Sequence, residues 1–245
     1  MSATRDEDQG SRGQRIVEAL LRRIDEGEWR ADQRLPVERE LAALFGCTRI
    51  TLREALQRLE ADGRIYRESR RGWFVSGARV RHDPTGIAGF MHYVAAQGRQ
   101  PRTELLNAQR RAAGADLARR LALNDASEEV FVLQRWRWID RRAVLLETNV
   151  VRASWVPTLL EYDLAGSLSA LLTRLGLRLA RSRLSMYPSV LDATQARRLQ
   201  TTTGMPCLRL QRTSYADDGR AVEFDIECWR HDALEISVDV QAPDA

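Results

Sequence analysis

Apolar residues recur at three- and four-residue spacing in three successive segments near the start of the chain. This spacing places them on one face of a helix and predicts helices over 12–27, 36–45 and 49–62. Thr48 is a suitable N-cap for the third helix, and Gly63 is a suitable stop after it. The inward stripe of the third helix consists of Leu52, Ala55, Leu56 and Leu59. The pattern therefore predicts a small helical domain in which the second and third helices are joined by a tight turn.

The hydrophobic pattern changes to period two directly after the third helix. Residues 64–66 and 72–75 alternate as strands do, and the segment 68–71 between them is a polar tip. This predicts a hairpin packed on the helices, with Arg67, Arg70 and Arg71 projecting from its tip toward a DNA backbone or minor groove. A helix-turn-helix followed by a basic wing is an arrangement typical of DNA-binding proteins.

The exposed start of the third helix carries Arg49, Thr51 and Arg53. Arginine forks onto guanine or phosphate, threonine hydroxyls bond either, and the first turn of a recognition helix is what meets the DNA. A solvated charged face is the alternative, since charge runs usually lie in water. The position between a tight turn and a wing favours DNA binding.

A polar linker over 77–84 ends at Pro84, and a helix is expected over 86–97. Beyond it, period-two stretches alternate with short helical segments, which predicts an α+β domain built on an antiparallel sheet. Turns at 140–142 and 216–220 join consecutive strands as hairpins. The strands are expected at 102–112, 129–139, 143–152, 178–187, 207–215, 221–230 and 234–240, and the helices at 115–122, 167–175 and 192–200, with Asp192 as the N-cap of the last.

Composition changes this picture little. All 38 basic residues are arginine, which a GC-rich genome explains better than function does, and the net charge is only +4. Residues 1–78 are almost neutral, with 15 arginines against 14 acidic residues, but residues 47–79 hold 8 against 4. The basic excess therefore lies at the third helix and the wing.

The sequence argues against a membrane protein, a secreted protein and a metal-binding protein. No apolar run approaches the roughly 20 residues of a membrane span, and residues 1–11 resemble a short disordered lead rather than a secretory signal. The three cysteines and three histidines are scattered without metal-ligand spacing. We therefore expect a cytoplasmic protein with no metal and no cofactor.

At LPVERELA and TRITLREAL, followed by the glycine-containing wing, the sequence resembles the GntR family of bacterial winged helix-turn-helix transcription regulators over about residues 14–76. Two residues depart from the family pattern: Val37 replaces a small polar residue after LP, which should affect a local cap or a phosphate contact. The wing reads RRGWF rather than GRGTF, which should alter its minor-groove contact. By this resemblance the operator contacts are expected from Arg39, Thr48, Arg49, Thr51, Arg53 and Gly72, with Arg71 at the wing tip.

The remainder of the chain contains QRWRWIDRRAVLLETN, the GSL from Gly166, PSVLDATQARRL and DDGRAVEFDIECWRHD. At these segments it resembles the HutC branch of that family, whose effector module is the UTRA domain. It implies a chorismate-lyase-like fold that binds small metabolites. The expected domains are the lead 1–11, a winged helix-turn-helix domain over 12–76, the linker 77–84 and a UTRA domain over 85–242.

Arg135 and Arg137 lie two residues apart on one expected strand, so they point to the same face, where paired guanidinium groups can hold a phosphate or carboxylate. A surface ion-pair ladder is equally compatible with the spacing. The resemblance implies that both arginines contact an effector, together with Glu147, Ser167 and Glu223. Ser167 is equally suited to be a helix cap.

Two further positions bear on the ligand. Ala88 and Gly89 precede Phe90 where sugar-phosphate-binding relatives carry a hydroxyl pair, and Trp229 stands where a tyrosine is frequent. The RRGWFVS wing and the terminal WRHD look similar to a branch associated with phosphonate utilisation, so a phosphonate or related anion is the first expectation. Trp136 and Trp138 face the opposite side of the sheet, where core packing or a subunit contact is favoured over ligand stacking.

The sequence as a whole predicts a homodimeric regulator, a repressor by resemblance, that binds double-stranded operator DNA and responds to a small anionic effector. Two alternatives remain. The second domain could be a catalytic, lyase-like module, although no G-x-S-x-G, phosphate loop or metal pair supports chemistry. The protein could also be a DNA-binding protein without an effector.

Overall fold

The computed structural model describes residues 3–68, 70–86 and 89–240. Its contacts divide the chain into two compact units. The first unit comprises residues 1–79 together with 191–205 and 231–233, and the second comprises 80–190, 206–230 and 234–245. No helix in the described part of the chain is long and apolar enough to cross a membrane.

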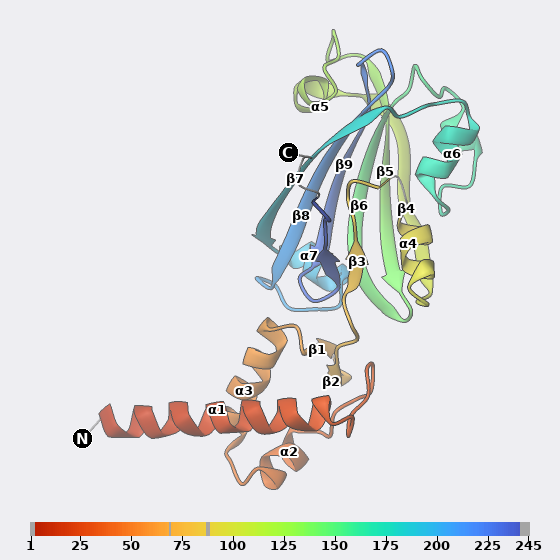
Figure 1. Ribbon diagram of the computed structural model, residues 1–245. Helices are drawn as coiled ribbons and strands as arrows, with labels where there is room; N and C mark the ends of the chain where they lie inside the picture. The colour runs from red at the N-terminus through yellow and green to blue at the C-terminus, as the bar shows by residue number, and fades with distance from the viewer. Residues whose placement is uncertain (1–2, 69, 87–88, 241–245) are drawn as a thin grey trace, which may run out of the picture. The chain divides into compact units, whose positions relative to one another are not determined.

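Three helices form the body of the first unit: α1 (Ala3–Asp25), α2 (Glu38–Leu44) and α3 (Arg49–Ala61) (Figure 1). The expectation of a disordered lead over 1–11 is wrong from Ala3 onward, because the first helix begins there rather than near residue 12. Residues 3–11 contain no proline, so the helix continues beyond its apolar stripe without any break.

The wing is an antiparallel hairpin of β1 (Ile65–Glu68) and β2 (Gly72–Val75), in which Tyr66 pairs with Phe74. Gly72 adopts a φ of 101°, a conformation that side chains with a Cβ rarely reach, so glycine is needed to begin the second strand. The hairpin closes on the helices through a common core that contains Leu20, Trp29, Leu41, Leu52, Leu56, Ile65 and Trp73.

The second unit is built on a six-stranded antiparallel sheet with strand order β4-β5-β6-β9-β8-β7 (Figure 1). The sequence alternation placed these strands well, except that β7 lies about three residues later than expected. The strands are β4 (Pro101–Ala112), β5 (Glu129–Ile139), β6 (Arg142–Arg152), β7 (Arg181–Val190), β8 (Pro206–Tyr215) and β9 (Ala221–Arg230).

Short helices cover the two faces of this sheet. Helix α6 (Leu168–Arg174) and the 3-10 turn η1 (Leu159–Glu161) pack with Phe131, Leu133 and Val151 on one face, which we call the inner face. Helix α5 (Gly114–Arg120) packs on the outer face against alternate residues of the same strands, Val130, Val132, Val150 and Phe224. Helix α4 (Phe90–Ala96) follows β3 (Val80–His82). Helix α7 (Ala193–Arg198) has Asp192 as its N-cap in a complete capping box and belongs to the first unit.

The expected linker over 77–84 is not wholly irregular. Residues Val80–His82 form β3, which pairs in parallel with β10 (Leu234–Ile236) in a separate two-stranded sheet. The strand expected over 234–240 is correspondingly short, because only three of its residues pair with β3. The strand was not predicted because the segment is mostly polar, although its alternate residues, Val80 and His82, are buried.

Truncating the core of the first unit should destabilise it. Leu56 is fully buried at the centre of that core, so Leu56→Ala is expected to lower the free energy of unfolding by about 3 kcal/mol. Urea denaturation followed by circular dichroism measures the loss. Ile50→Ala is the matched control on the same helix, because its side chain is 74% exposed and should change stability by less than about 0.5 kcal/mol. Equal losses in both variants would show that the core does not depend on Leu56.

Candidate functional site

A groove in the first unit gathers basic side chains from the start of α2, the start of α3 and the wing. Five residues predicted to contact DNA line it: Arg39, Arg49, Arg53, Arg70 and Gly72. Arg34 and Arg67 also line the groove. Arg34 was missed because it precedes the helix-turn-helix in a segment with no pattern of its own. The arrangement provides guanidinium forks over a surface contributed by three elements, as binding to a polyanion requires.

Glu38 on α2 is hydrogen-bonded to both α3 and the wing. Its carboxylate accepts hydrogen bonds from Arg53 on α3 (2.9 Å) and from the Trp73 indole N–H on the wing (3.1 Å). Burial alone would raise the pKa of Glu38, but these two hydrogen bonds outweigh it and hold the pKa below its usual value. The tryptophan of the RRGWF departure, Trp73, points inward and anchors the hairpin.

The remaining predicted DNA contacts have partners within the chain. Thr48 caps α3 by accepting from the Thr51 N–H (3.2 Å), and the two hydroxyls are 2.9 Å apart. Arg71 forms an ion pair with Glu68 of the same hairpin and lies over the ring of Phe74. Val37 stands at the N-cap of α2 without a side-chain cap, as its departure from the family pattern predicts.

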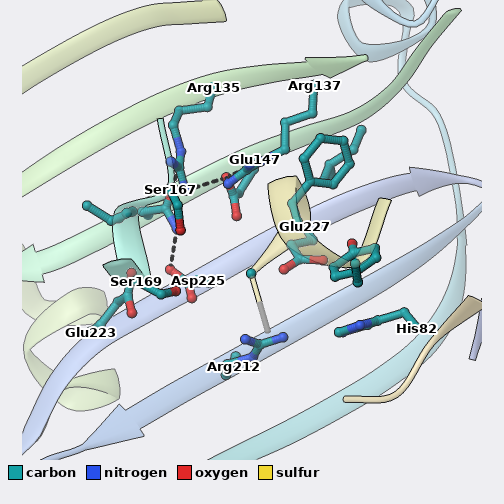
Figure 2. A pocket seen from close by; sticks show the side chains of 16 residues that line it. His82, Arg135, Arg137, Glu147, Ser167, Ser169, Arg212, Glu223, Asp225 and Glu227 are labelled. Carbon is teal, nitrogen blue, oxygen red and sulfur yellow. Dashed lines mark hydrogen bonds and ion pairs between the residues drawn. The ribbon is translucent and has the colours of Figure 1, made fainter. Parts of the chain in front are cut away.

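A pocket on the inner face of the sheet is lined by all five residues predicted to contact an effector: Arg135, Arg137, Glu147, Ser167 and Glu223 (Figure 2). They come from β5, β6, the start of α6 and β9, so the sheet register is what brings them together. The cavity volume is about 40 Å³, smaller than a metabolite, so side chains that line the pocket must move before a ligand of that size can enter.

Glu147 forms ion pairs with both arginines of β5. Its Oε2 lies 2.8 Å from Nη2 of Arg135 and 2.7 Å from Nη2 of Arg137, and all three side chains are buried. Burial would raise the pKa of Glu147, but the charges of the two arginines lower it. The carboxylate is therefore ionised at neutral pH and shared between two guanidinium groups.

The two arginines are held by further bonds. Nε of Arg135 donates to Asn149 (2.8 Å) and its Nη1 to the carbonyl of Gly166 (3.3 Å), while Nη1 of Arg137 donates to Thr103 (3.3 Å). The ladder of ion pairs considered from the spacing is thus present, but it is buried rather than on the surface. Both guanidinium groups form a rigid wall and keep N–H groups beyond those already used.

Three carboxyl groups alternate along β9 on the same face: Glu223, Asp225 and Glu227 all line the pocket. Burial raises the pKa of each one. The charges of neighbouring carboxylates add to the effect, most strongly at Asp225, which lies beside Glu223. Sequence analysis singled out Glu223 alone, although the alternation VEFDIE places all three on one face.

Ser167 has one of the two roles expected of it: it is the N-cap of α6, accepting from the Ala170 N–H (3.3 Å). It also lines the pocket, and its contact with an effector stays a prediction. Gly89 faces it: a Cβ there would lie 3.1 Å from the Ser167 hydroxyl oxygen, so a larger residue would crowd this wall. Ala88, the other residue of the departure from sugar-phosphate-binding relatives, lies outside the described residues.

Other pocket residues carried no sequence signal of their own. Arg212 on β8 and His82 on β3 point into the pocket (Figure 2). Burial and the charge of Arg212 lower the pKa of His82 to about 4, so its imidazole is neutral at pH 7. The ring stacks on Tyr93 of α4, with centroids 4.5 Å apart. Arg212 was overlooked because β8 alternates less clearly than the other strands.

The tryptophans differ from one another in role. Trp229 is fully buried and donates its indole N–H to Glu227 (2.6 Å). Trp136 and Trp138 lie together on the outer face, with centroids 4.6 Å apart, and do not line the pocket. In the described part of the chain, no group of three or more histidine, cysteine or acidic residues is arranged to hold a metal ion.

A winged helix-turn-helix unit with a basic groove, joined in one chain to a sheet unit with a polar pocket, defines a transcription regulator of the two-domain class. Residues 12–75 match the bacterial regulatory proteins of the gntR family, and residues 96–235 match the UTRA domain. The chain belongs to the GntR family of transcriptional regulators, in the HutC branch that carries a UTRA domain.

Similar proteins agree with this assignment over nearly the whole chain. The crystal structure of PhnF from Mycobacterium smegmatis is 30% identical, with 92% of this chain and 99% of that chain covered and a TM-score of 0.66. The transcriptional repressor NagR of Bacillus subtilis (strain 168) is 28% identical over 218 residues, 89% of each chain. The transcriptional regulator YihL of Escherichia coli (strain K12) is 27% identical over 224 residues, 91% of this chain and 95% of YihL.

The buried carboxyl groups of β9 should leave a signature in the pH dependence of stability. The pKa of Glu223 is raised on folding, so its protonated form is favoured in the folded chain, and the wild type loses stability as pH rises through the folded pKa. Glu223→Gln removes that loss. Its unfolding temperature is therefore expected to exceed the wild-type value at pH 8 by a margin that shrinks toward pH 4.

Scanning calorimetry from pH 4 to pH 8 measures this margin. The control is Asp217→Asn, which makes the same change of charge in the exposed turn between β8 and β9. A Glu223→Gln variant that is less stable than the wild type at pH 8 would show that the ionised carboxylate stabilises the fold, in conflict with a pKa raised by burial.

Proposed function

We propose that this protein is a repressor that binds operator DNA as a homodimer and releases it when a small anionic metabolite occupies the pocket of the UTRA domain. One observation supports this proposal most strongly. A single pocket is lined by Arg135, Arg137, Glu147, Ser167 and Glu223, and the other unit of the same chain bears a basic groove. A phosphonate, or a phosphorylated or carboxylated compound, is the class of effector proposed. We assign the pocket no catalytic role, and the protein acts in the cytoplasm, where its DNA lies.

The DNA-binding part of the proposal rests on the groove and on family membership. Arg39, Arg49 and Arg53 would meet base edges and phosphates in the major groove, and Arg70 and Arg71 would meet the backbone or minor groove beside it. Thr48, Thr51 and Gly72 would support these contacts, the threonines through hydroxyls that also cap α3. The two heads of a dimer would bind inverted half-sites.

The effector part rests on the guanidinium groups of the pocket. Arg135 and Arg137 keep N–H groups beyond those bonded to the protein. Arg212 lines the same pocket: burial would lower its pKa, but the charges of Glu227, Asp225 and other nearby carboxyl groups raise it. A phosphonate or carboxylate placed between them would gain charge-assisted hydrogen bonds in a buried site. Such a ligand controls DNA binding only if it favours one arrangement of the two units over another.

Removing the arginines of α3 should weaken operator binding. Arg49→Ala and Arg53→Ala are each expected to raise the dissociation constant about tenfold or more, and to reduce its dependence on salt, because each removes a charged contact to DNA. Fluorescence anisotropy measures this with an operator selected from genomic fragments. Arg119→Ala on the exposed face of α5 is the matched control. Wild-type affinity in both α3 variants would contradict the docking of this helix.

Occupation of the pocket should release the DNA. A thermal-shift screen of phosphonates, phosphorylated sugars and amino-acid derivatives is expected to yield compounds that raise the unfolding temperature and lower operator affinity. The double variant Arg135→Ala, Arg137→Ala tests whether these arginines are needed for the response to the effector, but it removes buried ion pairs and can unfold the unit. Arg212→Gln is therefore the second variant. It is expected to weaken the response to the effector while leaving DNA binding of the free protein unchanged. A regulator without an effector would show no compound that shifts either measurement.

A further inference from the structure

The carboxyl end of helix α3 is bonded by a residue from far along the chain. The carbonyl of Glu60, in the last turn of the helix, accepts a hydrogen bond from Nε2 of His231 (3.0 Å). A carbonyl oxygen only accepts, so the imidazole carries its proton on Nε2. The same carbonyl accepts from the Gly63 N–H (3.0 Å). His231 therefore adds a side-chain donor at one of the four carbonyls that the end of a helix leaves without a regular helical partner.

The main chain beside His231 lies against the same helix end. Gly63, which follows α3, has a φ of 72°, and a Cβ built on it would lie 2.9 Å from Cβ and 3.3 Å from Cα of Asp232. Both distances are shorter than the separation of packed carbon atoms. Asp232 is itself only 1% exposed. Gly63 was predicted as a helix stop, and its lack of a side chain also lets the backbone of Asp232 approach α3.

Two of the segments that pass from the first unit to the second leave the first unit at this helix end. Residues 231–233 belong to the first unit, whereas β9 before them and β10 after them belong to the second. Arg79 is the last residue of the first unit before β3, and its Nη2 donates to the carbonyl of Asp62 (3.4 Å). Directly beyond this point the two segments pair in parallel as β3 and β10, with Leu234 opposite Val80.

The same two segments lead to the pocket. His82, the last residue of β3, lines the pocket, and β9 contributes three carboxyl groups to it before the strand ends at Arg230. The side chain of Gln97, at the end of α4, bonds both the N–H (2.9 Å) and the carbonyl (2.8 Å) of Arg81 in β3. The path from the pocket to the end of α3 is therefore paired, hydrogen-bonded backbone rather than a loose linker.

The opposite end of α3 carries Arg49 and Arg53, which line the basic groove. The helix has 13 residues, so its two ends are about 18 Å apart. A secondary-structure element of this length transmits displacement as a rigid body. A change in the direction of the helix at its carboxyl end therefore moves both arginines in the groove.

We propose that the turn of residues 231–233 positions α3 for operator binding, with His231 as the positioning residue that bonds the helix end. The inference deepens the proposed function and rests on it, since it names the residues through which the pocket acts on the operator. Coupling of this kind is reciprocal. Operator DNA that fixes the start of α3 therefore also stabilises the turn and the strand β10 that follows it.

Substitution of His231 tests the hydrogen bond. His231→Ala removes the donor, whereas His231→Gln keeps an N–H donor close to the place of Nε2. Fluorescence anisotropy with the selected operator is expected to show a dissociation constant raised about fivefold or more in His231→Ala, and by less than about twofold in His231→Gln. His92→Ala, which removes an exposed imidazole from α4, is the matched control. Circular dichroism establishes that each variant is folded.

Amide hydrogen exchange of the full chain gives a second readout. In the free protein, His231→Ala is expected to speed exchange about fivefold at residues 62–64, because the helix end opens more readily. In the wild type, operator DNA is expected to slow exchange at residues 231–236, although the DNA meets the opposite end of α3. His231→Ala is expected to lose this protection, and DNA of unrelated sequence is the control.

The outcomes separate this inference from the proposed function. Wild-type operator affinity and wild-type exchange in His231→Ala would overturn the positioning role and leave operator binding through Arg49 and Arg53 intact. Equal weakening in His231→Ala and His231→Gln would also overturn it, because the donor would then not be what matters. If no DNA fragment binds the wild type, the proposed repressor fails and the positioning role fails with it.

Discussion

A single buried carboxylate, that of Glu147, holds together the inner face of the sheet. It neutralises two neighbouring guanidinium groups that would otherwise repel each other out of reach of water. Such a pair of charges contributes little net stability in itself, but removing one partner leaves the others buried and uncompensated. The positions of Arg135 and Arg137, and through them Asn149 and the loop at Gly166, all follow from this one residue.

This arrangement changes what the pocket offers a ligand. Two arginines that would be the strongest anion binders in isolation already use much of their hydrogen-bonding capacity on the protein. On β8 and β9, Arg212 and three carboxyl groups line the same cavity. Burial would lower the pKa of Arg212, but the charges of those carboxyl groups raise it.

The sequence predicted the fold class and nearly every strand, because alternation on a half-buried sheet is a strong pattern. The same alternation correctly placed Arg135 and Arg137 on one face. It could not predict which residues of other strands lie opposite them, because register is set by pairing across the sheet rather than by any one strand. Glu147 was therefore expected to contact a ligand, and its two ion pairs were not foreseen.

Other misses have similar physical causes. Asp225 and Glu227 are as visible in the sequence as Glu223, but a carboxylate in a strand gives no indication of its partner until the neighbouring strands are known. The strand at 80–82 escaped notice because its partner, Leu234–Ile236, is far away in the chain. The first turns of α1, from Ala3, were not predicted because this part of the helix has no apolar stripe.

The contact of Glu38 with both Arg53 and Trp73 constrains how proteins of this architecture can diverge. A substitution at Arg53 removes a side chain from the basic groove and at the same time strips a counter-charge from the residue that anchors the wing. A change of operator preference at this helix therefore disturbs the hairpin beside it, and compensating changes at positions 38 and 73 would be needed together. The recognition helix and the wing are expected to evolve as one unit, not residue by residue.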